Sequence, residues 1–124
     1  VRGAAVMAPA LAASLLAATP ANAGEVWAHG GTVIIKVVTG DKNYRQRTQW
    51  VTSITVMTST RKENSYGCGR FEGWTQGFYR AADRCESVHF YISRWVSSGN
   101  HVCGAFQDID RRWSRSIACI TIKV

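Results

Sequence analysis

The sequence predicts an all-β protein, a small antiparallel β-sandwich or barrel of about six or seven strands with two disulfides. Helical periodicity is absent after residue 24, whereas β-branched and aromatic runs bounded by Gly, Asn and Ser recur along the chain. The segment after the leader is short enough to form one domain. Its four cysteines are an even number, which indicates disulfides in an exported protein.

Residues 1–23 have the pattern of a secretory signal peptide. Arg2 precedes an Ala/Leu-rich apolar run, and the small residue Ala23 marks the expected cleavage point. The apolar run contains Pro9 and is shorter than the roughly 20 residues that a bilayer span needs. We therefore expect a single domain at 24–124, secreted to the extracellular space and without a membrane span after cleavage.

The first two strands are expected at residues 32–38 and 49–57. The run TVIIKVV is apolar on both faces, which indicates burial on both sides or coverage by a partner. In QWVTSITVM we place Trp50 and Ile54 on the same face of a half-buried strand. The segment TGDKNYRQRT at 39–48 is expected to be a long basic hairpin loop or an irregular edge.

The remaining strands form hairpins. Glycines and aromatic residues in CGRFEGWTQGFYRAADRC, residues 68–85, indicate a twisted, irregular hairpin. The alternation in SVHFYISRW, residues 87–95, is typical of a half-buried strand. A last hairpin is expected from the strands HVCGAFQ at 101–107 and IACITIKV at 117–124, joined by the loop at 108–116. The final strand either is internal in its sheet or leaves an edge for pairing with another chain.

The four cysteines allow three disulfide connectivities. We favour Cys68 with Cys85 and Cys103 with Cys119, because each pair brackets a segment short enough to be a hairpin. A zinc site would need closely spaced pairs such as C-x-x-C, which the sequence lacks. We therefore expect neither a metal nor another cofactor.

The predicted domain is basic. The chain has 15 Lys and Arg, one of which is Arg2 in the leader, and 8 Asp and Glu, so the formal charge of 24–124 is 14 − 8 = +6. Such a charge suits nucleic acid, anionic cell-wall polymers or an acidic protein partner, and it also serves solubility alone.

The titratable residues do not form a recognised catalytic pattern. The histidine and carboxylate candidates are His29, His89, His101, Glu72, Glu86, Asp108 and Asp110. Glu86 and His89 are close in sequence, as a ribonuclease pair would be, but three residues along a strand place them on opposite faces. Asp108 and Asp110 are followed by arginines, so we expect them to neutralise a turn instead of acting as a glycosidase pair. We predict a protein that is not an enzyme, with a small basic nuclease as the alternative.

Binding to another protein is the preferred interpretation. Among the five tryptophans, Trp50 and Trp95 are expected in the core or between the sheets, and Trp74 and Trp113 in connections. Trp and Arg are enriched at the positions that contribute most of the binding energy in protein interfaces. The segment DRRWSRS contains both residue types. Acidic residues next to these arginines argue against specific nucleic-acid binding. One alternative is sugar binding through Trp74 or Trp113. Another is that Trp113 folds back over the hairpin and its arginines are only solvated. The predicted contact residues are Arg111, Arg112, Trp113, Arg115, Trp74, Phe78 and Tyr79.

Several segments of the chain together resemble the small adaptor subunit of the antibacterial umbrella toxin particles of filamentous actinobacteria. These segments are the leader, WVTSITV, CGRFEGWTQGF, Cys85, and the pair HVCGAF and IACITIKV. The resemblance implies a non-enzymatic β-sandwich that joins a lectin to a repeat-bearing toxin scaffold by strand pairing and by a docked loop. The strand-pairing candidates would be Val33, Ile35, Val37, Ile120 and Ile122. A secreted enzyme inhibitor and a stand-alone antibacterial protein remain the other non-enzymatic alternatives.

Overall fold

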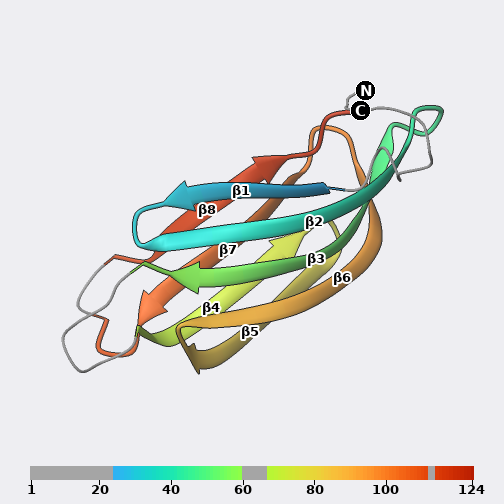
Figure 1. Ribbon diagram of the computed structural model, residues 1–124. Coiled ribbons are helices and arrows are strands. Elements are labelled where there is room, and N and C mark those ends of the chain that lie inside the picture. Colours follow the sequence, from blue (N-terminus) through green and yellow to red (C-terminus); the bar gives the residue numbers. More distant parts are fainter. Residues whose placement is uncertain (1–23, 60–66, 112–113) are drawn as a thin grey trace.

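The protein forms two four-stranded antiparallel sheets that pack face to face (Figure 1). The computed structural model describes residues 24–59, 67–111 and 114–124. Its strands are β1 (Gly24–Gly30), β2 (Val33–Asn43), β3 (Thr48–Thr58), β4 (Cys68–Thr75), β5 (Phe78–Cys85), β6 (Ser87–Ser97), β7 (His101–Asp108) and β8 (Ser116–Thr121). The sheet orders are β1-β2-β3-β6 and β5-β4-β7-β8. The predicted all-β sandwich is thus confirmed, whereas the predicted signal peptide at 1–23 lies outside the described residues.

The first sheet contains one strand that the sequence analysis did not identify. β1, with the sequence GEVWAHG, pairs along its whole length with β2. Most of its residues are exposed, so it lacks the apolar alternation that identifies a strand. β2 is also longer than expected: it continues to Asn43, so much of the basic segment is strand, and only the connection to β3 is a turn. There Asn43 Oδ1 accepts a hydrogen bond from the Gln46 N–H at 3.0 Å.

The expected placement of Trp50 beside Ile54 is wrong. The pairing of β3 with β2 shifts register between Val51 and Ser53, where β3 has one residue more than β2, and both Ser53 and Ile54 are buried. Such a bulge reverses the face on which the following side chains lie. Trp50 therefore lies on the outer face of the first sheet, where its ring contacts that of Trp95 edge to face at 5.5 Å, and Trp95 is 47% exposed. Neither tryptophan fills the space between the sheets.

The second sheet agrees closely with the sequence analysis. β4 and β5 form the predicted hairpin, with Cys68 directly opposite Cys85, and β7 and β8 form the last one, with Cys103 opposite Cys119. Both predicted disulfides are present. The described part of the chain contains no helix long and apolar enough to cross a membrane.

The core lies between the inner faces of the two sheets. Its fully buried side chains come from alternate positions of both sheets and include Val33, Ile35, Val56, Phe71, Phe106 and Val102. Within the core the sheets approach closely at Gly104, because a Cβ there would lie 2.5 Å from Ile35 Cγ2 and 2.9 Å from Val56 Cγ2. Packing at this density leaves no room for an added methyl group.

The edges of the sandwich correct one expectation about strand pairing. Val33, Ile35 and Val37 lie on β2, which is hydrogen-bonded to β1 on one side and to β3 on the other, so its main chain has no free edge. Ile122 is 1% exposed and belongs to the core. Ile120 lies on β8, the last strand in the order of its sheet, so among the described residues only this part of the prediction retains an edge.

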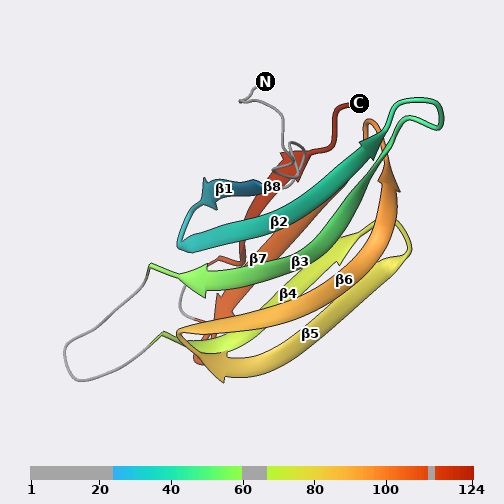
Figure 2. The same ribbon diagram turned by 45° about the vertical axis from the view of Figure 1, so that its right-hand side comes forward.

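The strands β1 and β8 come together where the two sheets meet at one side of the sandwich (Figures 1 and 2). The Thr32 N–H donates a hydrogen bond to Ser116 Oγ at 3.0 Å. A Cβ at Gly30 would lie 1.9 Å from the carbonyl oxygen of Ile117, so only glycine permits this approach of the two backbones. At the other side β5 lies beneath β6, and Arg94 of β6 donates to the carbonyl oxygen of Gly77.

Candidate functional site

The outer face of the β5-β4-β7-β8 sheet, which is the side turned away from the core, carries most of the predicted contact residues. Alternation along β4 places Arg70, Glu72 and Trp74 on this face, because Gly73 between them faces the core. The register then sets Tyr79 of β5 opposite Trp74, and alanines on both sides of Glu72. These small neighbours leave space above the Glu72 carboxylate for longer side chains.

Two side chains hold the Glu72 carboxylate. Arg115, just before β8, donates from Nε to Glu72 Oε1 at 2.6 Å, and the Tyr79 hydroxyl donates to Oε2. The Glu72 side chain is only 13% exposed, whereas that of Arg115 is 42% exposed. Charge-assisted hydrogen bonds of this kind are shorter and stronger than neutral ones. They fix the segment before β8 against the middle of the sheet.

Arg115 also stacks on an aromatic ring. Its guanidinium carbon lies 5.2 Å from the centroid of the Trp74 ring, within the range of a cation–π interaction. Glu72, Arg115, Trp74 and Tyr79 thus form one cluster of side chains from β4, β5 and the segment before β8. We refer to these four residues as the Glu72 cluster.

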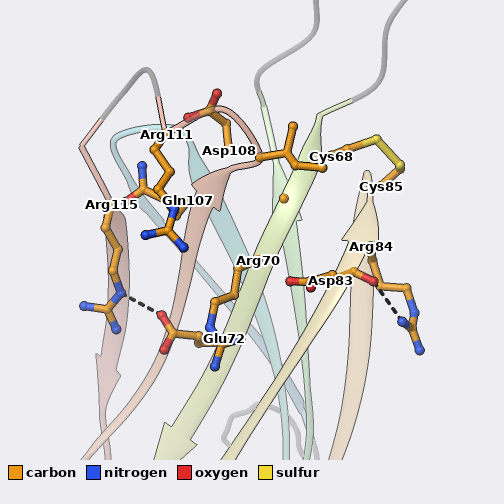
Figure 3. Close-up of a pocket in the computed structure, with 12 residues that line it drawn as sticks. Cys68, Arg70, Glu72, Asp83, Arg84, Cys85, Gln107, Asp108, Arg111 and Arg115 are labelled. Atoms are coloured by element: carbon orange, nitrogen blue, oxygen red, sulfur yellow. Dashed lines mark hydrogen bonds and ion pairs between the residues drawn. A yellow bond between two sulfur atoms is a disulfide. The ribbon is translucent and has the colours of Figure 1, made fainter.

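A shallow groove of about 700 Å³ lies beside the Glu72 cluster, at the end of the sheet where β4 begins and β5 and β7 end. It has four arginines, Arg70, Arg84, Arg111 and Arg115, and three acids, Glu72, Asp83 and Asp108, so the formal charge of its walls is 4 − 3 = +1. In Figure 3 Arg70 and Arg115 flank Glu72 from two sides and Arg111 reaches toward it from the loop after β7. The Cys68–Cys85 disulfide forms part of the wall.

The groups around the groove shift the pKa values of Glu72 and Arg70. Partial burial alone would raise the pKa of Glu72, but the hydrogen bonds from Tyr79 and Arg115 and the charges of Arg115 and Arg70 outweigh it, so the pKa lies below its ordinary value. The Tyr79 hydroxyl and the carboxylates of Glu72 and Asp83 raise the pKa of Arg70. Glu72 is therefore a carboxylate and Arg70 a cation throughout the neutral pH range.

The structure brings together four of the seven predicted contact residues. Trp74, Tyr79 and Arg115 belong to the Glu72 cluster, and Arg111 lines the groove. Phe78 is a correction: it is 7% exposed and belongs to the core, with the guanidinium groups of Arg80 and Arg94 over its ring. The remaining two, Arg112 and Trp113, lie outside the described residues.

The sequence analysis missed the two residues at the centre of the site. Glu72 was considered only as one of several titratable groups, and Arg70 was not considered. The spacing of Arg70, Glu72 and Trp74 at every second position of one strand was the signal that could have identified them, because it places all three on one face.

The histidines lie apart from this site. His89 is on the first sheet, where its Nδ1 is 2.8 Å from the Thr55 hydroxyl, and His101 Nδ1 is 3.0 Å from the Thr121 hydroxyl on the second. In the ranges that the structure describes, no three His, Cys, Asp or Glu residues are grouped so as to hold a metal ion.

Comparison of the chain with protein-family models, with curated proteins and with solved structures finds no match. The interpretation of the site therefore depends on its geometry.

Proposed function

We propose that the protein is a secreted, non-enzymatic protein-binding module, and that the outer face of the β5-β4-β7-β8 sheet is its main contact surface. The observation that carries this proposal is the Glu72 cluster beside the arginine-lined groove. Trp, Tyr and Arg are the residue types that most often dominate binding energy in protein interfaces. Here all three types are gathered on one face of a rigid sheet.

Apolar side chains around the cluster support the same function. Tyr79 is 45% exposed, Ile117 of β8 is 43% exposed, and Ile109, in the loop at the groove, is 71% exposed. Interfaces combine such desolvated apolar contacts with charged groups at their rim. Since the face offers both kinds of group, a partner with an apolar surface and acidic side chains fits it.

An adaptor needs a second contact, and the edge of β8 is suited to it. Among the described residues, β8 pairs through its main chain with β7 only, and β1 covers the start of its other side at Ser116 and Ile117. An edge strand of this kind offers main-chain groups for pairing with another chain. We infer that the protein is an adaptor subunit of an antibacterial toxin complex, with a lectin and a repeat-bearing scaffold as partners, as the sequence resemblance implies. The two disulfides are compatible with an extracellular protein.

The test is affinity purification of the tagged secreted protein from the culture medium of its producer, followed by mass spectrometry of the proteins that elute with it. Wild type is compared with Trp74→Ala and with Trp95→Ala, a matched tryptophan on the outer face of the opposite sheet. We expect wild type and Trp95→Ala to capture the same partners, and Trp74→Ala to lose at least one of them.

The identity of the captured proteins separates the alternatives. A lectin together with a large repeat-containing protein would support the adaptor, whereas a single secreted enzyme would point to an inhibitor. Recovery of the folded monomer alone, with both disulfides formed, would contradict a protein-binding function.

A further inference from the structure

The groove contains more guanidinium groups than its own ion pairs use. Arg115 is held by Glu72. Arg70, which lies beside Glu72 in Figure 3, and Arg111, which reaches toward Glu72, form no ion pair with any described residue. Arg70 is exposed on β4, and Arg111 comes from the loop after β7. Two cations therefore face the same open space.

The Glu72 cluster shows which kind of ligand such a space accepts. Its carboxylate receives one hydrogen bond from a guanidinium and one from a phenol, and arginine is over-represented where proteins recognise carboxylates. The planar guanidinium of arginine offers two parallel N–H donors to a carboxylate. Arg70 and Arg111 can each offer this fork to a carboxylate from outside the chain.

We propose that the groove binds an acidic peptide segment of the partner protein, with carboxylates of that segment paired to Arg70 and Arg111. This inference rests on the proposed protein-binding function and specifies the chemistry of the partner. The Glu72 carboxylate occupies the inner position of the groove, so the partner's carboxylates occupy the outer ones.

The charges around the two arginines favour a peptide over a nucleic acid. Asp83 lies opposite Arg70 in the register of β4 and β5, and Asp108 also lines the groove. A phosphate backbone carries one charge at every nucleotide and would meet these acids. The carboxylates of a peptide are on flexible side chains that can turn away from these acids, and any apolar side chain of the partner segment would contact Ile109 at the rim.

The test uses a fluorescein-labelled hexaglutamate peptide, with hexaglutamine as the neutral comparison, and fluorescence anisotropy at low salt. The binding variant is Arg70→Gln/Arg111→Gln. The control is Lys42→Gln/Arg45→Gln, which removes the same net charge from the distant hairpin between β2 and β3. We expect hexaglutamate, but not hexaglutamine, to bind, and the groove variant to weaken binding at least about tenfold. The control should change it less than twofold.

Three results of the anisotropy experiment would overturn the proposal. These are no binding of hexaglutamate to the wild type, equal weakening in the groove variant and the control, or tighter binding of a single-stranded oligonucleotide of the same charge than of hexaglutamate. None of them decides the proposed function, which depends on partner capture from the medium. Capture of a partner by wild type and by Arg70→Gln/Arg111→Gln alike would leave the binding module intact and refute the acidic segment.

Discussion

The substitution Glu72→Gln tests how the charges in the groove work together. It keeps the shape of the side chain and removes the negative charge that holds Arg115. The Tyr79 hydroxyl can still donate to the amide oxygen, so the sheet should remain intact. We expect the variant to bind hexaglutamate more tightly than wild type, because a third arginine becomes available and a nearby repulsive charge is gone.

The size of this effect follows from the spacing of the strand. Arg70 and Glu72 are two residues apart on β4, a spacing of roughly 7 Å along the strand, and we take this spacing as the separation between the Glu72 carboxylate and a carboxylate bound to Arg70. In a solvent-exposed groove the repulsion between two such charges is about 0.6 kcal/mol. Its removal corresponds to a roughly threefold gain in affinity. The loss of a charge-assisted hydrogen bond should lower the free energy of unfolding by about 1 kcal/mol.

Fluorescence anisotropy with hexaglutamate measures the affinity, and urea unfolding measures the stability. Glu25→Gln is the matched control, because Glu25 pairs with Lys36 at 3.9 Å on the other sheet. It should leave the peptide affinity unchanged. If folded Glu72→Gln bound the peptide no better than wild type, the groove would not be the place where acidic ligands bind.

Other substitutions test the fold and its pH dependence. Gly104→Ala should lower the free energy of unfolding, measured by urea titration, by about 1–3 kcal/mol because the added Cβ would overlap Ile35. Gly24→Ala is the control: no atom lies within 4 Å of the added Cβ, so the free energy of unfolding should not change. Replacement of Cys103 and Cys119 by serine should lower the free energy of unfolding by about 3 kcal/mol in the same titration, since the disulfide joins residues 16 apart in the sequence. An unchanged midpoint would contradict this. Because the folded-state pKa of Glu72 lies below the ordinary 4.5, its carboxylate stabilises the fold above about pH 4.5 and this contribution disappears as the pH falls through the folded-state value. The stability difference between wild type and Glu72→Gln should therefore shrink in acid, and a constant difference in urea titrations down to pH 2 would show that the cluster does not lower this pKa.

The sequence predicted those features of the fold that depend on local patterns. The alternation of β6 and the two cysteine-bracketed hairpins was sufficient to predict strands, pairing and both disulfides. β1 was missed because most of its residues are exposed, so its sequence lacks the apolar alternation that identifies a strand. The face of Trp50 was wrong because a bulge adds one residue to a strand, and a sequence does not mark where a register shifts.

The site was predicted in part for the same reason. Arg115 and Trp74 were correctly grouped by residue type, whereas Phe78 was wrong because at the start of β5 its side chain turns to the core. That Glu72 binds Arg115, 43 residues away, depends on the pairing of β4 with β7 and of β7 with β8, which follows only from the complete sheet order. Long-range register was therefore the information that the sequence analysis lacked.

Both disulfides lie in the sheet that carries the proposed contact surface, and the first sheet has neither of them. One cross-links β4 to β5 beside the groove, and the other joins β7 to β8, the strand that follows Arg115. A surface that is already rigid loses less conformational entropy when a partner binds than a flexible one does. Since the Glu72 cluster connects β4, β5 and the segment before β8, covalent cross-links and ion pairs restrain the same strands. The cross-links should therefore increase the affinity for a partner, because they keep the groove in its binding shape before the partner arrives.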